Sequence, residues 1–152
     1  MNINIFSIGK FKNNPQKEVF NIYIERIPWN VSLRELEIKS GGEAEVLKQK
    51  ESELLLNSAI SCDKIILLDE YGKNLSSMEF ADLIKNYRDS GQNNLAFIIG
   101  GASGVSDILR KKASQIISLG KMTFPHMMVR SILAEQLYRA YSIIHNHPYH
   151  RQ

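Results

Sequence analysis

Two short apolar runs limit most strongly what this chain can fold into. Residues 64–69 (KIILLD) and residues 95–99 (LAFII) are apolar almost without interruption. A strand with one face in water alternates apolar and polar residues, whereas a continuous apolar strand is typical of a parallel sheet covered on both faces. The two runs therefore predict parallel strands that lie between layers of helix.

Strand-like and helix-like segments alternate along the rest of the chain. Further strands are predicted at residues 2–8, 31–38 and 115–119. Helical patterns are predicted at residues 15–27, 43–60, 76–88, 106–112 and 125–144. This alternation is typical of an α/β fold. The 152 residues suit one domain, residues 1–152, with a mainly parallel sheet and helices on both faces.

Composition excludes several classes of protein. Cys62 is the only cysteine, so no disulfide can form within the chain, and we expect a reducing, cytoplasmic compartment. The longest apolar run has five residues, whereas a membrane span needs about 20, so no membrane association is expected. The first ten residues show no basic leader before an apolar block, as a secretory signal would.

The positive charge lies at the C-terminal end of the chain. Residues 1–120 carry 15 basic and 15 acidic side chains, so the net charge of +3 belongs to residues 121–152. All four histidines and three of the six tyrosines are there as well. Cations among aromatic rings suit phosphates and bases, so one interpretation is that this segment contacts nucleic acid. Ordinary surface charge on a C-terminal helix is the other.

The last predicted helix is apolar on more than one side. One stripe has helical spacing and comprises Val129, Ile132, Leu133, Leu137, Ala140, Tyr141 and Ile144. A second strip comprises Met127, Ala134 and Tyr138. One side would pack on the sheet and another could pack on a second copy, so we expect a homodimer. The alternative is a helix buried within a single chain.

Three loops are expected at one edge of the sheet, where parallel α/β sheets bind ligands. The loop after residues 95–99 is Gly-Gly-Ala-Ser-Gly, which either admits a ligand close to the backbone or makes a tight turn. It matches neither a dinucleotide-binding fingerprint nor a P-loop. The loop at residues 70–73 and the loop after Leu119 would leave the same edge, which predicts a pocket for a small amphipathic ligand.

Three other groups of residues give weaker indications of a functional site. His145, His147 and His150 lack a cysteine or a nearby acid other than Glu135, so we expect no metal site. Cys62 has no histidine within 60 residues along the chain, which favours an inert thiol. Glu135 and Arg139 are spaced for an ion pair on one helix face, either at the surface or orienting a polar substrate.

Several blocks of sequence resemble one family of enzymes. They are LDEYGK (residues 68–73), IIGG (98–101), KMTFPH (121–126), LAEQLYRAYSI (133–143) and HPYHR (147–151). Together they resemble the RlmH family, bacterial SPOUT-class methyltransferases of 23S ribosomal RNA, over the whole chain and in the same order. The resemblance implies a homodimer with a C-terminal trefoil knot. It also implies methylation of N3 of a pseudouridine on the assembled ribosome, with S-adenosylmethionine as the methyl donor.

The resemblance also assigns site residues. The implied cofactor contacts are Leu68, Gly100, Leu119, Gly120, Lys121, Met122, Thr123 and Phe124. Gly120 departs from the pattern, since serine is expected there in many relatives, and it matters only if a hydroxyl contacts the cofactor. The implied catalytic residues are Glu135, Arg139, Tyr149, His150 and Arg151.

Roles for the catalytic residues follow from the chemistry that the resemblance implies. Methyl transfer is an in-line displacement, so the protein mainly positions two groups and excludes water. Arg139 and Arg151 would favour the deprotonated imide nitrogen, and His150 is the nominal general base. Tyr149, His150 and Arg151 would hold the target nucleotide.

The C-terminal tail, residues 147–152, follows the end of the last helix. We expect it to add little to the core and to reach the active site across the dimer interface. Two alternatives remain open: an RNA-binding protein without turnover, which cofactor binding would test, and a methyltransferase of another RNA such as tRNA.

Overall fold

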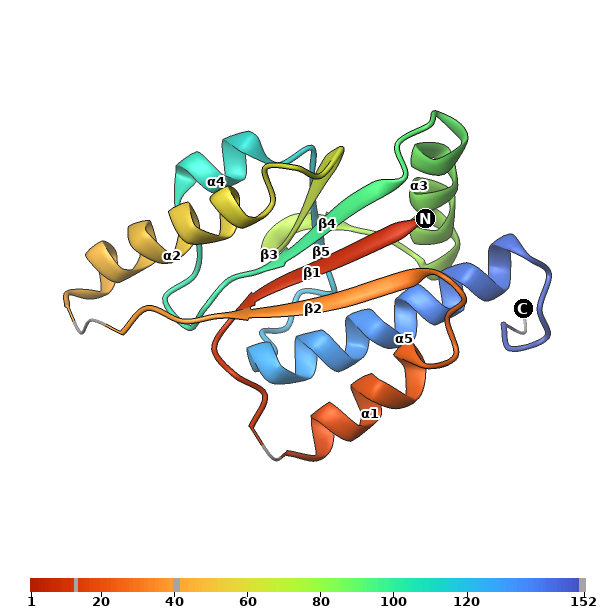
Figure 1. The fold of residues 1–152 in the computed structure, drawn as a ribbon, viewed down its shortest axis with the longest axis horizontal. Coiled ribbons are helices and arrows are strands. Elements are labelled where there is room, and N and C mark those ends of the chain that lie inside the picture. Colours follow the sequence, from red (N-terminus) through yellow and green to blue (C-terminus); the bar gives the residue numbers. More distant parts are fainter. Residues whose placement is uncertain (13, 40–41, 151–152) are drawn as a thin grey trace.

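The computed structural model describes residues 1–12, 14–39 and 42–150, and it contains a five-stranded parallel sheet (Figure 1). The strands are β1 (Asn2–Ile8), β2 (Asn30–Leu36), β3 (Lys64–Asn74), β4 (Asn94–Ile99) and β5 (Gln115–Ser118). Their order across the sheet is β2-β1-β4-β3-β5, and every pair is parallel. The predicted α/β class and parallel sheet are confirmed, with the two apolar runs in the middle of the sheet.

Five helices cover both faces of the sheet. They are α1 (Pro15–Ile24), α2 (Ala44–Ser58), α3 (Ser77–Asp89), α4 (Asp107–Lys112) and α5 (His126–Ile144). Figure 1 shows α2 and α4 on one side of the sheet and α1 and α5 on the other. The core follows the same division, because successive strand residues point to opposite faces. Leu95 and Phe97 of β4 pack with α1, α3 and α5, while Ala96 and Ile98 pack with α2 and α4.

Helix starts are set locally by the predicted caps. The Ser76 hydroxyl accepts a hydrogen bond from the Glu79 amide at 3.2 Å, and the Glu79 carboxylate accepts one from the Ser76 amide at 2.7 Å. This is a capping box, which satisfies two amides at the start of α3. The Ser106 hydroxyl caps α4 through the Leu109 amide at 3.2 Å.

The predicted loop at residues 70–73 is wrong, because β3 continues to Asn74. Leu68 and Lys73 both lie opposite Ile117 of β5, so the ladder resumes after an irregularity. Gly72 permits the close approach: a Cβ there would lie 2.5 Å from the Ile117 carbonyl carbon. The polar residues and the glycine suggest a turn, but backbone pairing with β5 keeps the segment in the sheet. Smaller differences are the ends of α1 at Ile24 and of β2 at Leu36.

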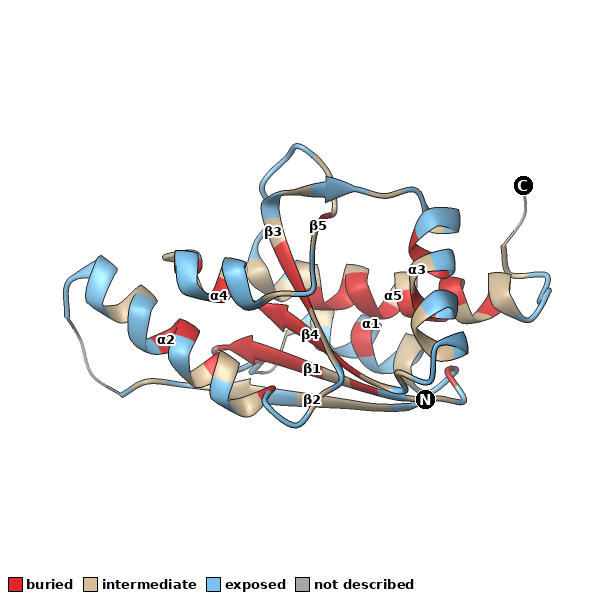
Figure 2. Ribbon diagram, turned by 90° about the horizontal axis from the view of Figure 1, so that it is seen from above, coloured by how far each residue is buried: buried red, intermediate tan, exposed pale blue. Residues whose placement is uncertain are grey.

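Both apolar sides of α5 are covered within the chain. Leu133, Leu137 and Ala140 of the first stripe are buried, and so are Ala134 and Tyr138 of the second. Helices α1 and α3 pack against α5 together with the sheet, and Figure 2 shows this burial along α5. The fold of one chain thus explains part of the pattern that suggested a partner subunit, while the other residues of the two strips are half-buried. The homodimer and the trefoil knot stay predictions.

Arg130 of α5 is a fully buried cation that ties this helix to β1 and β2. Its Nη1 donates to Glu35 Oε1 at 3.0 Å, and its Nη2 donates to the carbonyl oxygens of Ile8 and Gly9 at 2.7 and 2.9 Å. The guanidinium also lies 4.8 Å from the centre of the Phe11 ring. A buried charge is tolerated when it is paired and hydrogen-bonded in this way. The contacts fix the start of α5 relative to the ends of β1 and β2.

Among the helices that the structure describes, none combines the length and the apolar character that crossing a membrane requires.

Candidate functional site

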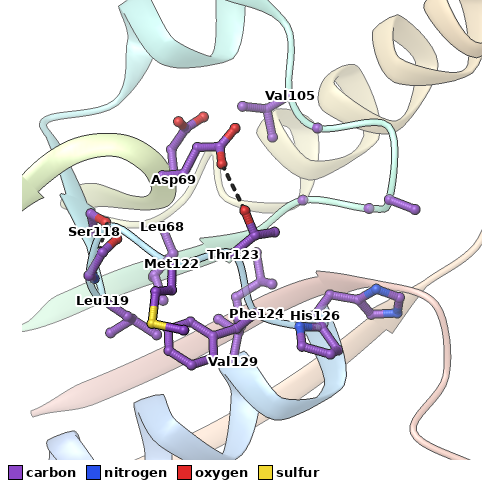
Figure 3. Close-up of a pocket in the computed structure, with 18 of the residues that line it drawn as sticks. Leu68, Asp69, Val105, Ser118, Leu119, Met122, Thr123, Phe124, His126 and Val129 are labelled. Carbon is purple, nitrogen blue, oxygen red and sulfur yellow. Dashed lines mark hydrogen bonds between the residues drawn. The ribbon is translucent and has the colours of Figure 1, made fainter.

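A pocket of about 360 Å³ opens at the carboxyl edge of the sheet (Figure 3). Its walls come from the middle of β3, from the ends of β4 and β5 and the loops that follow them, from Arg110 of α4, and from the first turn of α5. Apolar side chains such as Leu68, Leu119, Phe124 and Val129 line it beside a few polar groups. This is the place where parallel α/β sheets bind ligands, and the size suits a small organic molecule.

The glycine loop after β4 packs tightly on the elements beneath it. A Cβ on Gly100 would lie 2.6 Å from Val105 Cγ1, and one on Gly101 would lie 2.7 Å from Glu51 Oε2. A side chain at Gly100 would therefore clash with Val105, whereas one at Gly101 would have to displace the carboxylate end of Glu51. Gly104 has φ +76°, a left-handed conformation that favours glycine, and its amide donates to the Gly101 carbonyl at 3.0 Å.

Helix α2 supports this loop from below through two buried polar residues. The Ser52 hydroxyl accepts a hydrogen bond from the Ser106 amide at 2.8 Å and so fixes the start of α4. Glu51 is only 8% exposed, and its Oε2 has no hydrogen-bond partner in the described part of the chain. Burial raises the pKa of the Glu51 carboxyl. The sequence did not reveal either residue, since both lie within an ordinary helical pattern.

The loop after β5 forms the other wall of the pocket. Gly120 has φ +142°, which L side chains rarely adopt, and nothing lies within 4 Å of a Cβ built there. The Ser118 hydroxyl donates to the Gly120 carbonyl at 2.6 Å. Further along the loop, the Thr123 hydroxyl donates to Glu70 Oε2 at 3.2 Å, which links the loop to β3. Gly120 therefore serves the backbone turn, and a serine there would be strained.

Asp69 and Arg110 form an ion pair on the pocket wall. Arg110 donates to Asp69 Oδ2 from Nε at 3.0 Å and from Nη2 at 2.9 Å. The Tyr71 amide donates to the other carboxylate oxygen at 2.9 Å. The side chain of Asp69 is 6% exposed, so its charge is both buried and compensated.

His126 lies at the start of α5, on the opposite side of the pocket. Burial lowers the pKa of His126, and the charge of Arg130 lowers it further. The imidazole is therefore neutral at pH 7.

Most of the expected cofactor residues meet in this pocket. Leu68, Gly100, Leu119, Gly120, Met122, Thr123 and Phe124 line it, whereas Lys121 is exposed and does not. Asp69, Arg110 and His126 line it too, although sequence reasoning did not select them. Asp69 directly follows the apolar run of β3, a position that places it at the ligand-binding edge.

The expected catalytic residues form a second group, here called the tail cluster: Glu135, Arg139, Tyr149 and His150. Glu135 Oε1 accepts hydrogen bonds from Arg139 Nε at 2.9 Å, from Arg139 Nη2, and from the Tyr149 hydroxyl at 3.0 Å. Arg139 Nη1 lies 3.4 Å from His150 Nδ1, and its guanidinium lies 4.9 Å from the centre of the Tyr149 ring. Arg151 lies outside the described residues.

Tyr149 is half-buried and packs against the hydrophobic core, whereas the tail was expected to add little to it. Its ring centroid lies 4.6 Å from that of Tyr138, and its hydroxyl lies 3.4 Å from the Tyr23 hydroxyl. Burial raises the pKa of Tyr149, and the hydrogen bonds with Tyr23 and Glu135 add to the effect. Tyr149 is therefore a hydrogen-bond donor at neutral pH.

The pocket and the tail cluster lie toward opposite ends of α5. Val129 is the last α5 residue that lines the pocket, and Arg139 follows ten residues later, about 15 Å along the helix axis. Figure 1 shows the described residues that follow α5 at the far end of that helix from its start. Within one chain, the two groups of residues therefore do not form one site. The described residues also bring no three His, Cys, Asp or Glu side chains together around a metal position.

The fold and the pocket define an α/β protein with a pocket of ligand size at the carboxyl edge of a parallel sheet. The family model described as "Predicted SPOUT methyltransferase" matches residues 1–150. The chain therefore belongs to the SPOUT methyltransferase family.

Two relatives support this assignment. "Ribosomal RNA large subunit methyltransferase H" of Paramagnetospirillum magneticum is 43% identical over 151 residues, and the protein of that name from Rhizobium etli is 42% identical over 159 residues. Each alignment covers 99% of both chains.

The solved structures are similar in fold. A probable methylase family protein from Haemophilus influenzae has a TM-score of 0.62 at 10% identity, over 99% of this chain and 70% of its own. A probable methyltransferase from Bordetella pertussis has a TM-score of 0.59 at 9% identity, over 92% of this chain and 95% of its own.

Proposed function

We propose that this chain methylates N3 of a pseudouridine in 23S ribosomal RNA, with S-adenosylmethionine as the methyl donor. It would act in the cytoplasm, as a homodimer, on the assembled ribosome. Family membership and the names of its relatives support methylation of large-subunit ribosomal RNA. The observation that carries the proposal is the pocket, where seven residues assigned by the family resemblance line one cavity.

The residues of this pocket fit the methyl donor. Apolar walls from Leu68, Leu119 and Phe124 suit an adenine ring, and the glycine loop leaves its backbone free of side chains. The bound donor supplies an electrophilic methyl group on a sulfonium. The chain's own task is to orient that group and to exclude water, which accounts for much of the rate in such displacements.

The tail cluster suits the RNA side of the reaction. Arg139 is held by Glu135, and this hydrogen bond raises the pKa of its guanidinium, so the cation is permanent. Its Nη1, which Glu135 does not use, could donate a hydrogen bond to the deprotonated imide nitrogen that must attack the methyl group. Tyr149 offers an aromatic ring for a base that is turned out of the RNA. His150, next to Arg139, is the candidate general base.

The distance between the two groups supports a composite site. About 15 Å of helix separates Arg139 from the pocket in one chain. A symmetric dimer could bring the tail cluster of one copy to the pocket of another, which would form two complete sites.

Mass spectrometry of 23S ribosomal RNA tests the proposed function. Ribosomes from a strain that lacks this protein should lack one methyl group on a pseudouridine, and the purified protein with S-adenosylmethionine should restore it. Intact ribosomes should be methylated and free RNA should not. Ribosomal RNA with an unchanged methylation pattern would contradict the proposal, and methylation of tRNA instead would assign another substrate.

A further inference from the structure

Four residues in the lining of the pocket can carry a charge: Asp69, Glu70, Arg110 and His126. Their balance bears on which ligand the pocket prefers, because charges in a partly enclosed site interact more strongly than charges in open water.

Three of these residues contribute little net charge. Asp69 and Arg110 form a two-hydrogen-bond ion pair, so their charges largely cancel. Arg110 also contacts the exposed carboxylate of Asp107 at 3.2 Å, so it has no surplus positive charge for a ligand. His126 is neutral at pH 7, because burial and Arg130 both lower its pKa.

Glu70 is the remaining anion of the pocket wall. Its carboxylate accepts a hydrogen bond from the Thr123 hydroxyl, and within the described residues it forms no ion pair. The Thr123 contact holds the carboxylate against the loop that follows β5, at the pocket. The lining therefore carries a net charge close to −1, located at Glu70.

We propose that Glu70 makes the pocket selective for the charged methyl donor over the product of the reaction. This inference rests on the proposed function. S-adenosylmethionine has a sulfonium, an ammonium and a carboxylate, so it is a net cation, whereas S-adenosylhomocysteine has lost the sulfonium charge and is neutral overall. An uncompensated carboxylate attracts the donor more than the product, so the donor competes better with the product for the pocket.

The experiment compares the dissociation constants of both ligands by calorimetry, for the wild-type chain and for Glu70→Gln. The glutamine keeps the size of the side chain and an oxygen that can accept from Thr123. Affinity for S-adenosylmethionine should fall roughly threefold, as expected for one exposed charge interaction. Affinity for S-adenosylhomocysteine should stay the same. In the wild type, the preference for the donor should also shrink as salt is raised, because salt screens exposed charges.

Two control variants separate charge at the pocket from other effects. Glu25→Gln removes a carboxylate next to the end of α1, at the opposite edge of the sheet, and should leave the ratio of the two affinities unchanged. Thr123→Val removes the contact that holds the Glu70 carboxylate at the pocket but keeps its charge, so it should lower the preference for the donor by less than Glu70→Gln does.

The possible results distinguish this inference from the proposed function. If the wild type binds both ligands and Glu70→Gln leaves the ratio unchanged, the selectivity inference alone is overturned. If Glu70→Gln weakens both ligands equally, Glu70 acts on the loop and the inference is also overturned. If the wild type binds neither ligand, both the inference and the proposed function fail.

Discussion

Tyr149 joins the tail cluster to the core through one ring and one hydroxyl. The ring packs on Tyr138, while the hydroxyl donates to Glu135 and lies near Tyr23. Substitution can separate these two contributions, because phenylalanine keeps the ring and removes the hydroxyl.

Tyr149→Phe should lower the turnover of ribosome methylation about tenfold and leave the dissociation constant of S-adenosylmethionine unchanged. A contact made mainly in the transition state behaves in this way. The free energy of unfolding should fall by about 1 kcal/mol, the usual contribution of one hydrogen bond. Single-turnover methylation, calorimetry and urea unfolding measure the three quantities.

Tyr141→Phe is the matched control, because its ring packs on Trp29 and His145 and its hydroxyl makes no hydrogen bond within the described residues. It should leave turnover unchanged. An equal loss in both variants would mean that the Tyr149 hydroxyl has no special role.

Glu51 predicts an unusual dependence of stability on pH. Its pKa is raised by burial, so the folded chain holds the proton more tightly than the unfolded chain, whose carboxyl titrates near 4.3. This residue favours the folded state at low pH, and that contribution is lost as the pH rises through the folded pKa.

The glutamine in Glu51→Gln does not titrate. The Tm of this variant minus the Tm of the wild type should therefore be roughly 2–4 °C larger at neutral pH than at pH near 4. Thermal unfolding at both pH values measures the difference. Glu53→Gln, an exposed change on the same helix, should shift Tm by less than about 1 °C at either pH. A constant Tm difference between Glu51→Gln and the wild type would show that the charge of Glu51 is not destabilising.

At the scale of single elements, Val105, which follows the glycine loop after β4, packs against that loop. The sequence suggested that Gly100 leaves room for a ligand, whereas the structure gives a further reason, the 2.6 Å distance between a Cβ and Val105 Cγ1. Gly100→Val would clash inside the protein whether or not a ligand contacts this position.

Gly100→Ala should therefore weaken S-adenosylmethionine binding, and the added change Val105→Ala should restore it to the level of Val105→Ala alone. Removing the Val105 methyl groups relieves the internal clash, so the restored affinity would assign Gly100 to packing. Calorimetry on the single and double variants gives the answer. If binding stays lost in the double variant, the Cβ meets the ligand itself.

The tail is an element of both the core and the candidate RNA site. A chain that ends at Asn146 should keep S-adenosylmethionine affinity within about twofold and lose at least about 100-fold in methylation, because the tail contacts are needed only with RNA. Removing the half-buried Tyr149 ring should also cost about 1–2 kcal/mol of folding free energy. Calorimetry, ribosome methylation and urea unfolding test each part. Loss of cofactor binding would show that the tail closes the pocket, and full methylation would remove the tail from the site.

At the scale of the whole molecule, the separation of pocket and tail cluster makes a prediction about assembly. Sedimentation should give about twice the 17.4 kDa chain mass. The sharper test mixes two inactive variants: Ala102→Trp, which fills the pocket, and Arg139→Ala, which breaks the tail cluster.

If each site uses the pocket of one copy and the tail of another, a mixed dimer contains one intact site. An equal mixture that exchanges subunits should then recover about a quarter of wild-type methylation. Each variant alone should stay inactive. The composite site would be contradicted if the mixture had no activity and sedimentation showed that the active protein is a monomer. One chain would then hold the whole site.

The fold could be predicted from the sequence because its signals are local. Apolar runs, helical spacing and the Ser76 and Ser106 caps act over a few residues, and these determined the α/β class, the parallel sheet and the order of the elements. The same periodicity indicated that α5 is apolar on two sides. It did not say what covers them, which in the structure is α1, α3 and the sheet.

The pocket was predicted in part, since strand ends and glycine loops mark the carboxyl edge of a parallel sheet. The sequence by itself determined that the loops after β4 and β5 meet there and, through family resemblance, most of the lining residues, whereas the third predicted loop is part of β3. Only the tertiary structure decided the rest, because contacts between residues far apart in the chain carry no local pattern. Asp69 pairs with Arg110, Glu51 lies behind Gly101, Gly72 lets β3 pass close to β5, and Tyr149 packs on Tyr138.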